Sequence, residues 1–308
     1  MTNRGFVTYA RLTIVAVLFV ILWGAYVRAS GSGAGCGEHW PMCKGEVIPQ
    51  SPSLKTMIEF SHRVTSGLSL LLVVGLFWLA RRIFPVGHGA RRSSGWALAF
   101  IFGEAGVGAM LVLLALVGHN DSALRAGVIA LHLLNTFLLL YWLTFCAHCG
   151  LTSQVMTPEA SWSRARVNLL LCLGFFAAIG AAGAVVALGD TLFPSTSLVS
   201  GLAEDLSAGN HFLIRLRVIH PILAIFGSIY IFFQLYSLPR LNGLRIDMKS
   251  SRWVAFALLL QILLGALNVF LLAPIWLQMA HLFAADVVWI LLASLYINSF
   301  LPNQNEPA

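Results

Sequence analysis

The sequence has 308 residues, of which 58% are hydrophobic and only 10% are charged. A soluble protein of this size carries roughly 25% charged residues, so the composition excludes a soluble globular protein and indicates a polytopic membrane protein. The net charge of +7 would suggest nucleic-acid binding in a soluble protein, but here the positions of the basic residues relative to the membrane explain it. A nucleic-acid partner is therefore not expected.

Eight segments are long and apolar enough to cross a bilayer, which takes about 20 mostly apolar residues. The first segment lacks a small-residue cleavage site, so we interpret it as a permanent span and not as a signal peptide. The sequence thus predicts an all-α polytopic membrane protein. In chain order, we expect the spans at residues 9–29, 61–80, 96–117, 124–146, 166–188, 212–236, 253–273 and 276–298.

The basic residues predict the orientation, because cytoplasmic loops carry an excess of lysine and arginine. With the N-terminus inside, twelve basic residues lie on the inner side: Arg4, Arg11, Arg81, Arg82, Arg91, Arg92, Arg164, Arg166, Arg240, Arg245, Lys249 and Arg252. The other seven lie outside: Arg28, Lys44, Lys55, Arg63, Arg125, Arg215 and Arg217. We expect cytoplasmic N- and C-termini in the plasma (inner) membrane of a prokaryote, with residues 31–43 on the outer face.

The two halves of the chain resemble each other, which indicates a duplicated four-helix unit. Because four is an even number, both copies have the same orientation in the membrane. The predicted architecture is two tandem pseudo-symmetric four-helix bundles, residues 1–150 and 151–308, and such bundles can hold a cofactor between facing helices. The similar pairs are GEAGVGAMLV (103–112) with LQILLGALNV (260–269), IALHLLNTFLLL (129–140) with QMAHLFAADVVWIL (278–291), and, more weakly, GAYVRAS (24–30) with GAVVALG (183–189).

Four histidines lie near the outer ends of the even-numbered spans, at one shared depth: His62, His132, His220 and His281. A single buried imidazole often only forms a hydrogen bond to a neighbouring helix. Two pairs in equivalent positions of the two halves favour axial ligation of haem iron within each bundle. Zinc is disfavoured, because no set of thiolates or carboxylates converges with each pair.

Arginines on the outer side accompany these histidines and could pair with haem propionates. The alternative is that they only extend to the membrane interface. Because they depart from the positive-inside tendency only beside the histidines, the propionate interpretation is favoured. The candidates are Arg63, Arg125, Arg215 and Arg217.

The halves differ in ways that predict chemistry in the first one. Glu59 stands three residues before His62, whereas Arg217 takes the same place before His220. A carboxylate at this position can relay a proton or stabilise positive charge on a substrate, although a carboxylate near a helix N-terminus is also favoured by the helix dipole alone. The first half also has two outer cysteines, whereas the outer segment 189–211 has none.

These motifs together resemble the haem A synthase family, over about residues 10 to 300. The resemblance rests on GSGAGCGEHWPMCKG, IEFSHRVTSG, the repeated LLGALNV-type segment and the paired histidines. It implies that the methyl group at ring position 8 of haem O is hydroxylated successively to give the formyl group of haem A, which serves terminal oxidases. It therefore also implies a role in cytochrome oxidase biogenesis.

The resemblance also implies roles for individual residues. His62 and His132 would hold the substrate haem O, and His220 and His281 would ligate a permanent haem b. Glu59 would be the catalytic carboxylate, and Cys36 and Cys43 match the family's outer cysteine pair. Some family members carry a second pair between the fifth and sixth spans, and its absence here puts in doubt any mechanism that needs cysteine pairs in both halves. No independent metal site is expected.

Cys36 and Cys43 face the oxidising side in the predicted orientation, so we expect a disulfide between them. It would serve either as a structural closure of the loop, contributing about 2–4 kcal/mol, or as a redox-active pair near the substrate haem. The structural role is slightly favoured.

Two other functions compete with the enzyme. A membrane cytochrome b with two histidine ligands would pass electrons from quinol without oxygenation chemistry, but Glu59 and the one-sided cysteine loop favour the enzyme. A transporter is disfavoured, because the polar residues cluster near the outer side and not at the midplane. The expected partners are haem O, the enzyme that makes haem O, an electron donor that the sequence does not identify, and the lipid bilayer; a homo-oligomer is compatible with the sequence.

Overall fold

A computed structural model describes residues 2–151, 163–240 and 248–300 of the chain. These residues contain eight helices that are long and apolar enough to cross a membrane, and they form no β-strand. The predicted all-α, multi-pass membrane protein is therefore confirmed. Arg245 and the C-terminus, which the sequence places on the inner side, lie outside the described residues.

The spans follow the predicted order, and each of the eight is longer than predicted. Seven are single helices: α1 (Asn3–Ala29), α2 (Leu54–Ile83), α3 (Gly89–Leu113), α4 (Ala123–Cys149), α5 (Arg164–Leu192), α9 (Met248–Phe270) and α10 (Ile275–Asn298). The sixth span, Phe212–Arg240, is composite. It consists of α7 (Phe212–Arg215), a 3-10 turn η1 (Leu216–Val218), α8 (Ile219–Ser237) and a second 3-10 turn η2 (Leu238–Arg240).

Polar caps extend three of the helices beyond the apolar stretches from which the spans were predicted. The side-chain oxygens of Ser53, Ser122 and Ser163 each accept a hydrogen bond from a backbone N–H in the first turn of α2, α4 and α5. A serine at this position satisfies one of the N–H groups that a helix start leaves without a partner. Hydropathy does not detect such caps, so the predicted spans began too late.

Two prolines explain why the sixth span is not one continuous helix. Pro221 has no N–H to donate and its ring clashes with the carbonyl four residues earlier, and the 3-10 turn η1 immediately precedes this part of the chain. Pro239 lies in η2, directly after α8 ends at Ser237. A further short helix, α6 (Leu198–Leu206), lies in the outer segment where the sequence predicted none.

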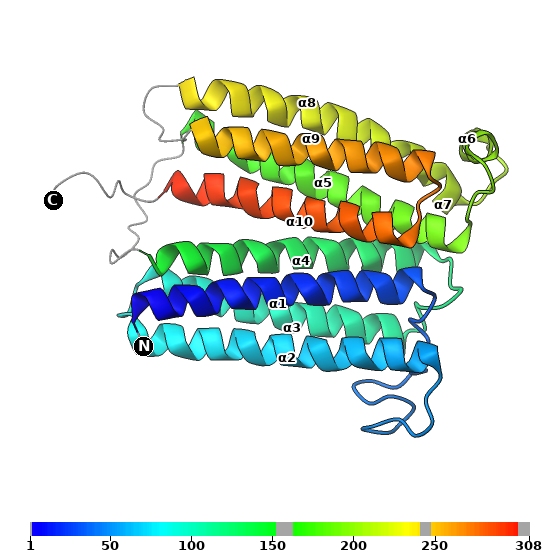
Figure 1. The fold of residues 1–308 in the computed structure, drawn as a ribbon, viewed down its shortest axis with the longest axis horizontal. Helices are drawn as coiled ribbons and strands as arrows, with labels where there is room; N and C mark the ends of the chain where they lie inside the picture. The colour runs from blue at the N-terminus through cyan, green and yellow to red at the C-terminus, as the bar shows by residue number, and fades with distance from the viewer. Residues whose placement is uncertain (1, 152–162, 241–247, 301–308) are drawn as a thin grey trace.

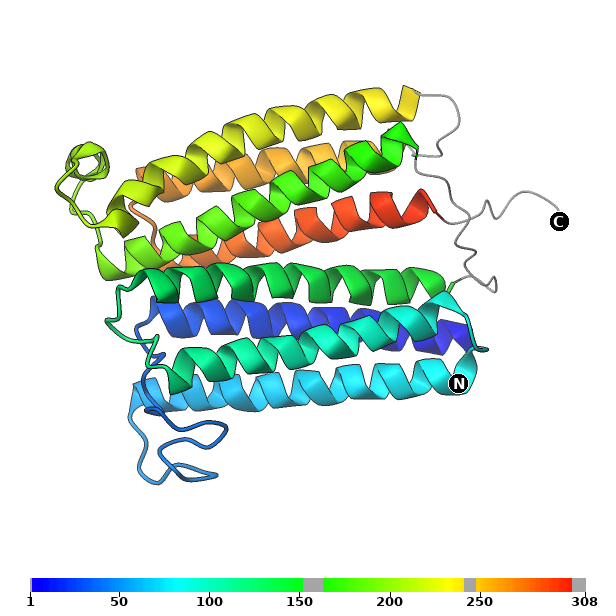
Figure 2. The same cartoon turned by 180° about the vertical axis from the view of Figure 1, so that it is seen from behind.

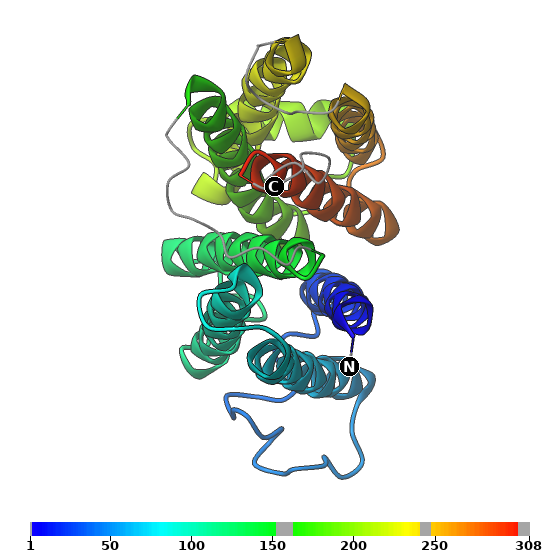
Figure 3. The ribbon, with the colours of Figure 1, turned by 90° about the vertical axis from the view of Figure 1, so that its left-hand side faces the viewer.

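The helices pack side by side in two groups (Figures 1 and 2). One group is α1 to α4, and the other is α5 with α8, α9 and α10. Viewed along the helices, α1 and α4 of the first group face α5 and α10 of the second (Figure 3). The loop between α1 and α2 and the helix α6 lie at the same end of the molecule, and Asn3 of α1 lies at the opposite end.

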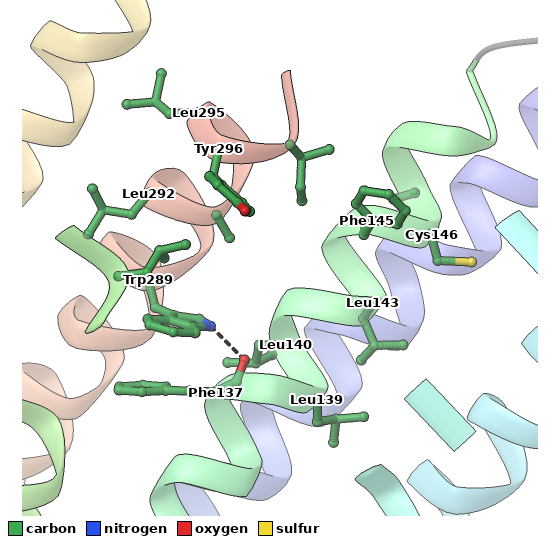
Figure 4. Packing of buried hydrophobic residues seen from close by; sticks show 14 of the residues in the cluster. Phe137, Leu139, Leu140, Leu143, Phe145, Cys146, Trp289, Leu292, Leu295 and Tyr296 are labelled. Atoms are coloured by element: carbon green, nitrogen blue, oxygen red, sulfur yellow. Dashed lines mark hydrogen bonds between the residues drawn. The ribbon is translucent and has the colours of Figure 1, made fainter. Parts of the chain in front are cut away.

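The contact between α4 and α10 joins the two groups through an aromatic core (Figure 4). The ring of Trp289 stacks on Phe137 with centroids 4.5 Å apart, and its indole N–H donates a 2.6 Å hydrogen bond to the Phe137 carbonyl oxygen. Phe176 of α5 also packs against Phe137, with ring centroids 6.1 Å apart. Because lipid tails are as apolar as these side chains, close packing and such hydrogen bonds hold the helices together.

We predict that Trp289→Ala lowers the free energy of unfolding by about 3–5 kcal/mol, because it removes a large buried side chain. The measurement is thermal or denaturant unfolding in detergent. The control is Trp276→Ala on the same helix, because Trp276 is 65% exposed and Trp289 only 5%. Equal losses in the two variants would contradict the role given to this contact.

Candidate functional site

The four predicted histidines lie in two pairs, one in each group of helices. His62 and His132 belong to α2 and α4, and His220 and His281 belong to α8 and α10. The second pair lies together, with ring centroids 6.5 Å apart and ring planes perpendicular at 89°. Imidazole nitrogens bind a transition metal at about 2.0–2.1 Å, so two rings on opposite sides of one ion have centroids about 6 Å apart.

The first pair shares one feature with the second, a buried imidazole nitrogen without a hydrogen-bond partner in the part of the chain that the structure describes. His62 lies within electrostatic range of His132. The Nδ1 atom of His62 is buried and has no hydrogen-bond partner among the described residues, and the same is true of His281. A buried nitrogen without a partner is costly, so a ligand that uses the imidazole would relieve that cost.

Three of the four imidazoles pack against a glycine of the neighbouring helix. A Cβ at Gly24 would lie 2.8 Å from His62 Cε1, one at Gly183 would lie 2.9 Å from His220 Cε1, and one at Gly265 would lie 3.0 Å from His281 Cε1. Any larger residue would therefore push the ring out of place. Gly24 and Gly183 occupy equivalent positions in the repeated segments 24–30 and 183–189.

His132 has a different neighbour. Gly108, which corresponds to Gly265 in the repeat, has nothing within 4 Å of a Cβ. Instead, Glu104 of α3 places Oε2 2.8 Å from His132 Nδ1. A single carboxylate therefore approaches this pair, and the described residues contain no group of three or more metal-ligating side chains.

Glu59 is buried beneath the cysteine loop, and both of its carboxylate oxygens are engaged. Oε2 accepts a 2.8 Å hydrogen bond from the backbone N–H of Cys36, and Oε1 lies 2.5 Å from the Arg63 guanidinium. The side chain is only 4% exposed. The carboxylate therefore links the start of α2 to the loop. Its role is thus not limited to the interaction with the helix dipole that the sequence suggested.

Arg63 fastens the same loop from the other side. Its Nη1 donates hydrogen bonds to the carbonyl oxygens of His39 at 2.6 Å and Met42 at 2.5 Å. The expected disulfide between Cys36 and Cys43 is present in this loop. Thr56 adds a further tie, because its hydroxyl donates to the Gly35 carbonyl oxygen at 2.8 Å. Most of the guanidinium is thus used by protein groups.

The other predicted propionate partners differ in how many of their guanidinium N–H groups already form hydrogen bonds with the protein. Arg125 is 4% exposed and its Nη1 donates to the carbonyl oxygens of Gly118 and Asn120, but its Nε is buried without a hydrogen-bond partner among the described residues. The Nη1 atom of Arg28 is also buried without a hydrogen-bond partner among the described residues. The charges of Asp190 and Arg125 both act on the Arg28 guanidinium. Gly24 and Arg28 share one face of α1, because they are four residues apart.

Arg217 binds residues at the end of α5 and in the segment between α5 and α7. Its guanidinium contacts Asp190 at 2.9 Å and Asp205 at 3.5 Å, and it also donates to the Gly189 and Phe193 carbonyl oxygens. Arg215 is exposed. The sequence did not predict this structural role of Arg217. Because its guanidinium already binds two carboxylates and two carbonyl oxygens, few of its N–H groups remain for a ligand.

Sequence reasoning missed Glu104, Arg28 and the glycines that receive the imidazoles. A signal for Glu104 was present, because the repeat aligns it with Gln261, and Gln261 also contacts a histidine: its Nε2 lies 3.2 Å from His281 Nε2. The glycine signal was present too, since Gly24 and Gly183 begin the two aligned segments. Periodicity alone does not tell which neighbouring helix a residue faces.

The chain is similar in sequence to proteins of known families. Residues 7–293 match the family described as cytochrome oxidase assembly protein, COX15-CtaA. The chain is 36% identical over 157 residues to a protein of Alkalihalophilus pseudofirmus named Heme A synthase, covering 50% of each chain. It is 33% identical over 138 residues to one of the same name from Halalkalibacterium halodurans, covering 44% of this chain and 46% of the relative.

A longer match carries a different name. The chain is 44% identical over 285 residues to a protein of Thermus thermophilus named Protoheme IX farnesyltransferase, covering 92% of this chain and 46% of that protein. The chain thus spans about half the length of the curated relatives it matches.

We predict that Arg63→Ala loosens the cysteine loop, because hydrogen bonds to a charged group contribute about 1.5–3 kcal/mol each. The rate at which a water-soluble thiol reduces the Cys36–Cys43 disulfide should then rise on the order of tenfold. Mass spectrometry after alkylation measures this rate. The matched control is Arg215→Ala, an exposed arginine far from the loop; an unchanged rate in Arg63→Ala would show that the guanidinium does not hold the loop.

Proposed function

Because the chain belongs to the cytochrome oxidase assembly protein family COX15-CtaA, we propose that it is a haem A synthase. It would oxidise the methyl group at ring position 8 of haem O to a formyl group by successive hydroxylations. The observation that carries the proposal is the presence of two histidine pairs in equivalent positions of two helix groups, in which imidazole nitrogens are buried without a hydrogen-bond partner among the described residues. Relatives named Heme A synthase match at 33% and 36% identity.

The two pairs would have different roles. His62 and His132 would hold the substrate haem O, and His220 and His281 would ligate a resident haem b, which supplies one-electron transfer when bound. The recurrence of glycine against histidine at Gly24 and Gly183 supports two tandem pseudo-symmetric four-helix bundles, residues 1–150 and 151–308. The 6.5 Å spacing of the second pair suits a haem held from both sides.

Glu59 would act on the substrate from the first half. Its carboxylate is held by Cys36 N–H and by Arg63, so its position is fixed before any ligand arrives. A fixed, buried carboxylate can take up a proton or stabilise positive charge near the reacting methyl group. The loop that carries Cys36 and Cys43 would keep water away from this carboxylate, and the disulfide would keep the loop closed.

The haem propionates are anionic and need cationic partners near a polar surface. Arg125 and Arg28 suit this task in the first half, because each has a buried guanidinium nitrogen without a hydrogen-bond partner among the described residues. Arg215 suits it in the second half. Arg63 and Arg217 would mainly hold the outer segments in place, since their guanidinium groups already bind protein oxygens.

The farnesyltransferase name is consistent with this proposal. More than half of that relative lies outside the region matched by this chain, and we assign its printed activity to that part. Farnesylation of protohaem supplies the apolar tail that distinguishes haem O, so we propose the enzyme that makes haem O as a partner. Direct transfer between the two would keep an apolar substrate out of water.

The remaining features of the proposal come from the sequence. The protein would lie in the plasma (inner) membrane of a prokaryote with both termini in the cytoplasm and the cysteine loop on the outer face. The hydroxylations oxidise the methyl carbon, so an oxidant that supplies the inserted oxygen would be needed together with a separate electron donor. A homo-oligomer is compatible with the reaction.

We predict that cells supplied with haem O and expressing the chain yield hydroxymethyl and formyl haem on extraction. Glu59→Gln should lower this yield by about 10²–10⁴-fold, the usual contribution of an acid–base group, and should retain bound haem because the amide oxygen still accepts from Cys36 N–H. Liquid chromatography of extracted haems measures both. Glu38→Gln, an exposed carboxylate of the same loop, is the control.

If the wild-type chain carries haem b and never yields oxidised haem O, it is a cytochrome b and the proposal fails. If Glu59→Gln turns over at the wild-type rate, the role of Glu59 is wrong and the proposed reaction still holds.

We predict that Gly183→Ala lowers the haem b content by about tenfold or more, in line with other changes that displace a metal ligand. The added Cβ would lie 2.9 Å from His220 Cε1. Gly174→Ala on the same helix is the matched control, because a Cβ there would have nothing within 4 Å. Haem per protein, measured as the pyridine haemochrome, should fall only in the first variant; equal haem in both would contradict the placement of haem b at His220.

A further inference from the structure

The two histidines on α4 and α10 are equivalent in the repeat, but their neighbours differ in charge. His132 faces the carboxylate of Glu104, whereas His281 faces the amide of Gln261. Glu104 and Gln261 hold the same place in the aligned segments 103–112 and 260–269. The duplicated position therefore contacts a histidine in both halves, at Nδ1 of His132 and at Nε2 of His281, and it carries a negative charge only in the first half.

The Glu104 carboxylate is held in place from three sides. Its Oε2 lies 2.8 Å from His132 Nδ1. Its Oε1 accepts hydrogen bonds from Asn135 at 2.5 Å and from Thr136 at 3.1 Å. Asn135 is fixed in turn, because its amide also donates to the Phe100 carbonyl oxygen at 2.8 Å.

This network is specific to the first half. The residues that correspond to Asn135 and Thr136 in the second repeat are Ala284 and Ala285, which have no polar side chain. At these aligned positions the second half therefore has neither the carboxylate nor the groups that hold it in the first half. A buried carboxylate in a membrane helix is costly unless it is paired and hydrogen-bonded, so the whole set points to a purpose in the first half.

We propose that Glu104 is a positioning residue that holds His132 through Nδ1, so that Nε2 faces the substrate haem, and that it makes this imidazole a stronger donor to iron than His281. The inference rests on the proposed function. A histidine that binds a metal through one ring nitrogen commonly donates the N–H of the other to a carboxylate. This hydrogen bond fixes the orientation of the ring and raises its basicity. A stronger donor with a nearby negative charge stabilises ferric over ferrous iron.

The consequence is an electronic difference between two otherwise similar haem sites. The haem of the first half would have the lower midpoint potential, and the haem b of the second half would have the higher one. Gln261, which aligns with Glu104, is the neutral residue beside the second histidine pair and so allows a comparison within one molecule.

The test exchanges the two residues in the full-length, haem-loaded chain. Glu104→Gln should raise the midpoint potential of one haem only, and Gln261→Glu should lower that of the other. Redox titration followed by visible spectra measures both potentials, and the low-spin ferric electron paramagnetic resonance signal reports the change in axial ligand. Glu104→Gln should also release the first-half haem to apomyoglobin about 10–100-fold faster.

Three outcomes separate the inference from the proposed function. If Glu104→Gln leaves both potentials and the haem release rate unchanged while the wild type makes haem A, the inference is wrong and the function stands. If His62→Ala leaves the bound haems and their spectra unchanged, the first half holds no haem and the proposed function fails. If Glu104→Gln does not accumulate, Thr136→Val keeps the carboxylate and removes one of the hydrogen bonds that partly neutralise its charge. It should lower the same potential by a smaller amount, and no shift would overturn the inference.

Discussion

A histidine ring can lie between two packed helices only where the neighbouring helix leaves room for it. In three of the four positions that room comes from a glycine: Gly24, Gly183 and Gly265. A glycine in a helix interior costs about 0.5–1 kcal/mol relative to alanine, so close approach of the imidazole is the physical reason for it.

The two halves secure the segments beside their histidines, residues 31–53 and 189–211, by different means. In the first half, Glu59 and Arg63 bind the backbone of a loop that a disulfide closes. In the second half, Arg217 binds Asp190, Asp205 and backbone carbonyls, with no cysteine between residues 189 and 211. The residue three places before the histidine thus acts on that segment in both halves, with opposite charge.

The sequence predicted what depends on composition and spacing along a single helix. The eight spans, the four histidines and the Cys36–Cys43 disulfide all follow from such patterns. Contacts between helices do not, because periodicity defines a face without naming its neighbour. Glu104 against His132 and Arg28 beside Arg125 were therefore missed, and so was α6, whose nine residues lie in a segment expected to be a loop.

The central claim is that each histidine pair holds one haem. A cryo-electron microscopy structure of the chain purified with haem O tests it most directly. The account predicts one porphyrin between His62 and His132 and another between His220 and His281, with propionates of the first beside Arg28 and Arg125. Porphyrin density at neither pair, or at a site outside both, would contradict the account.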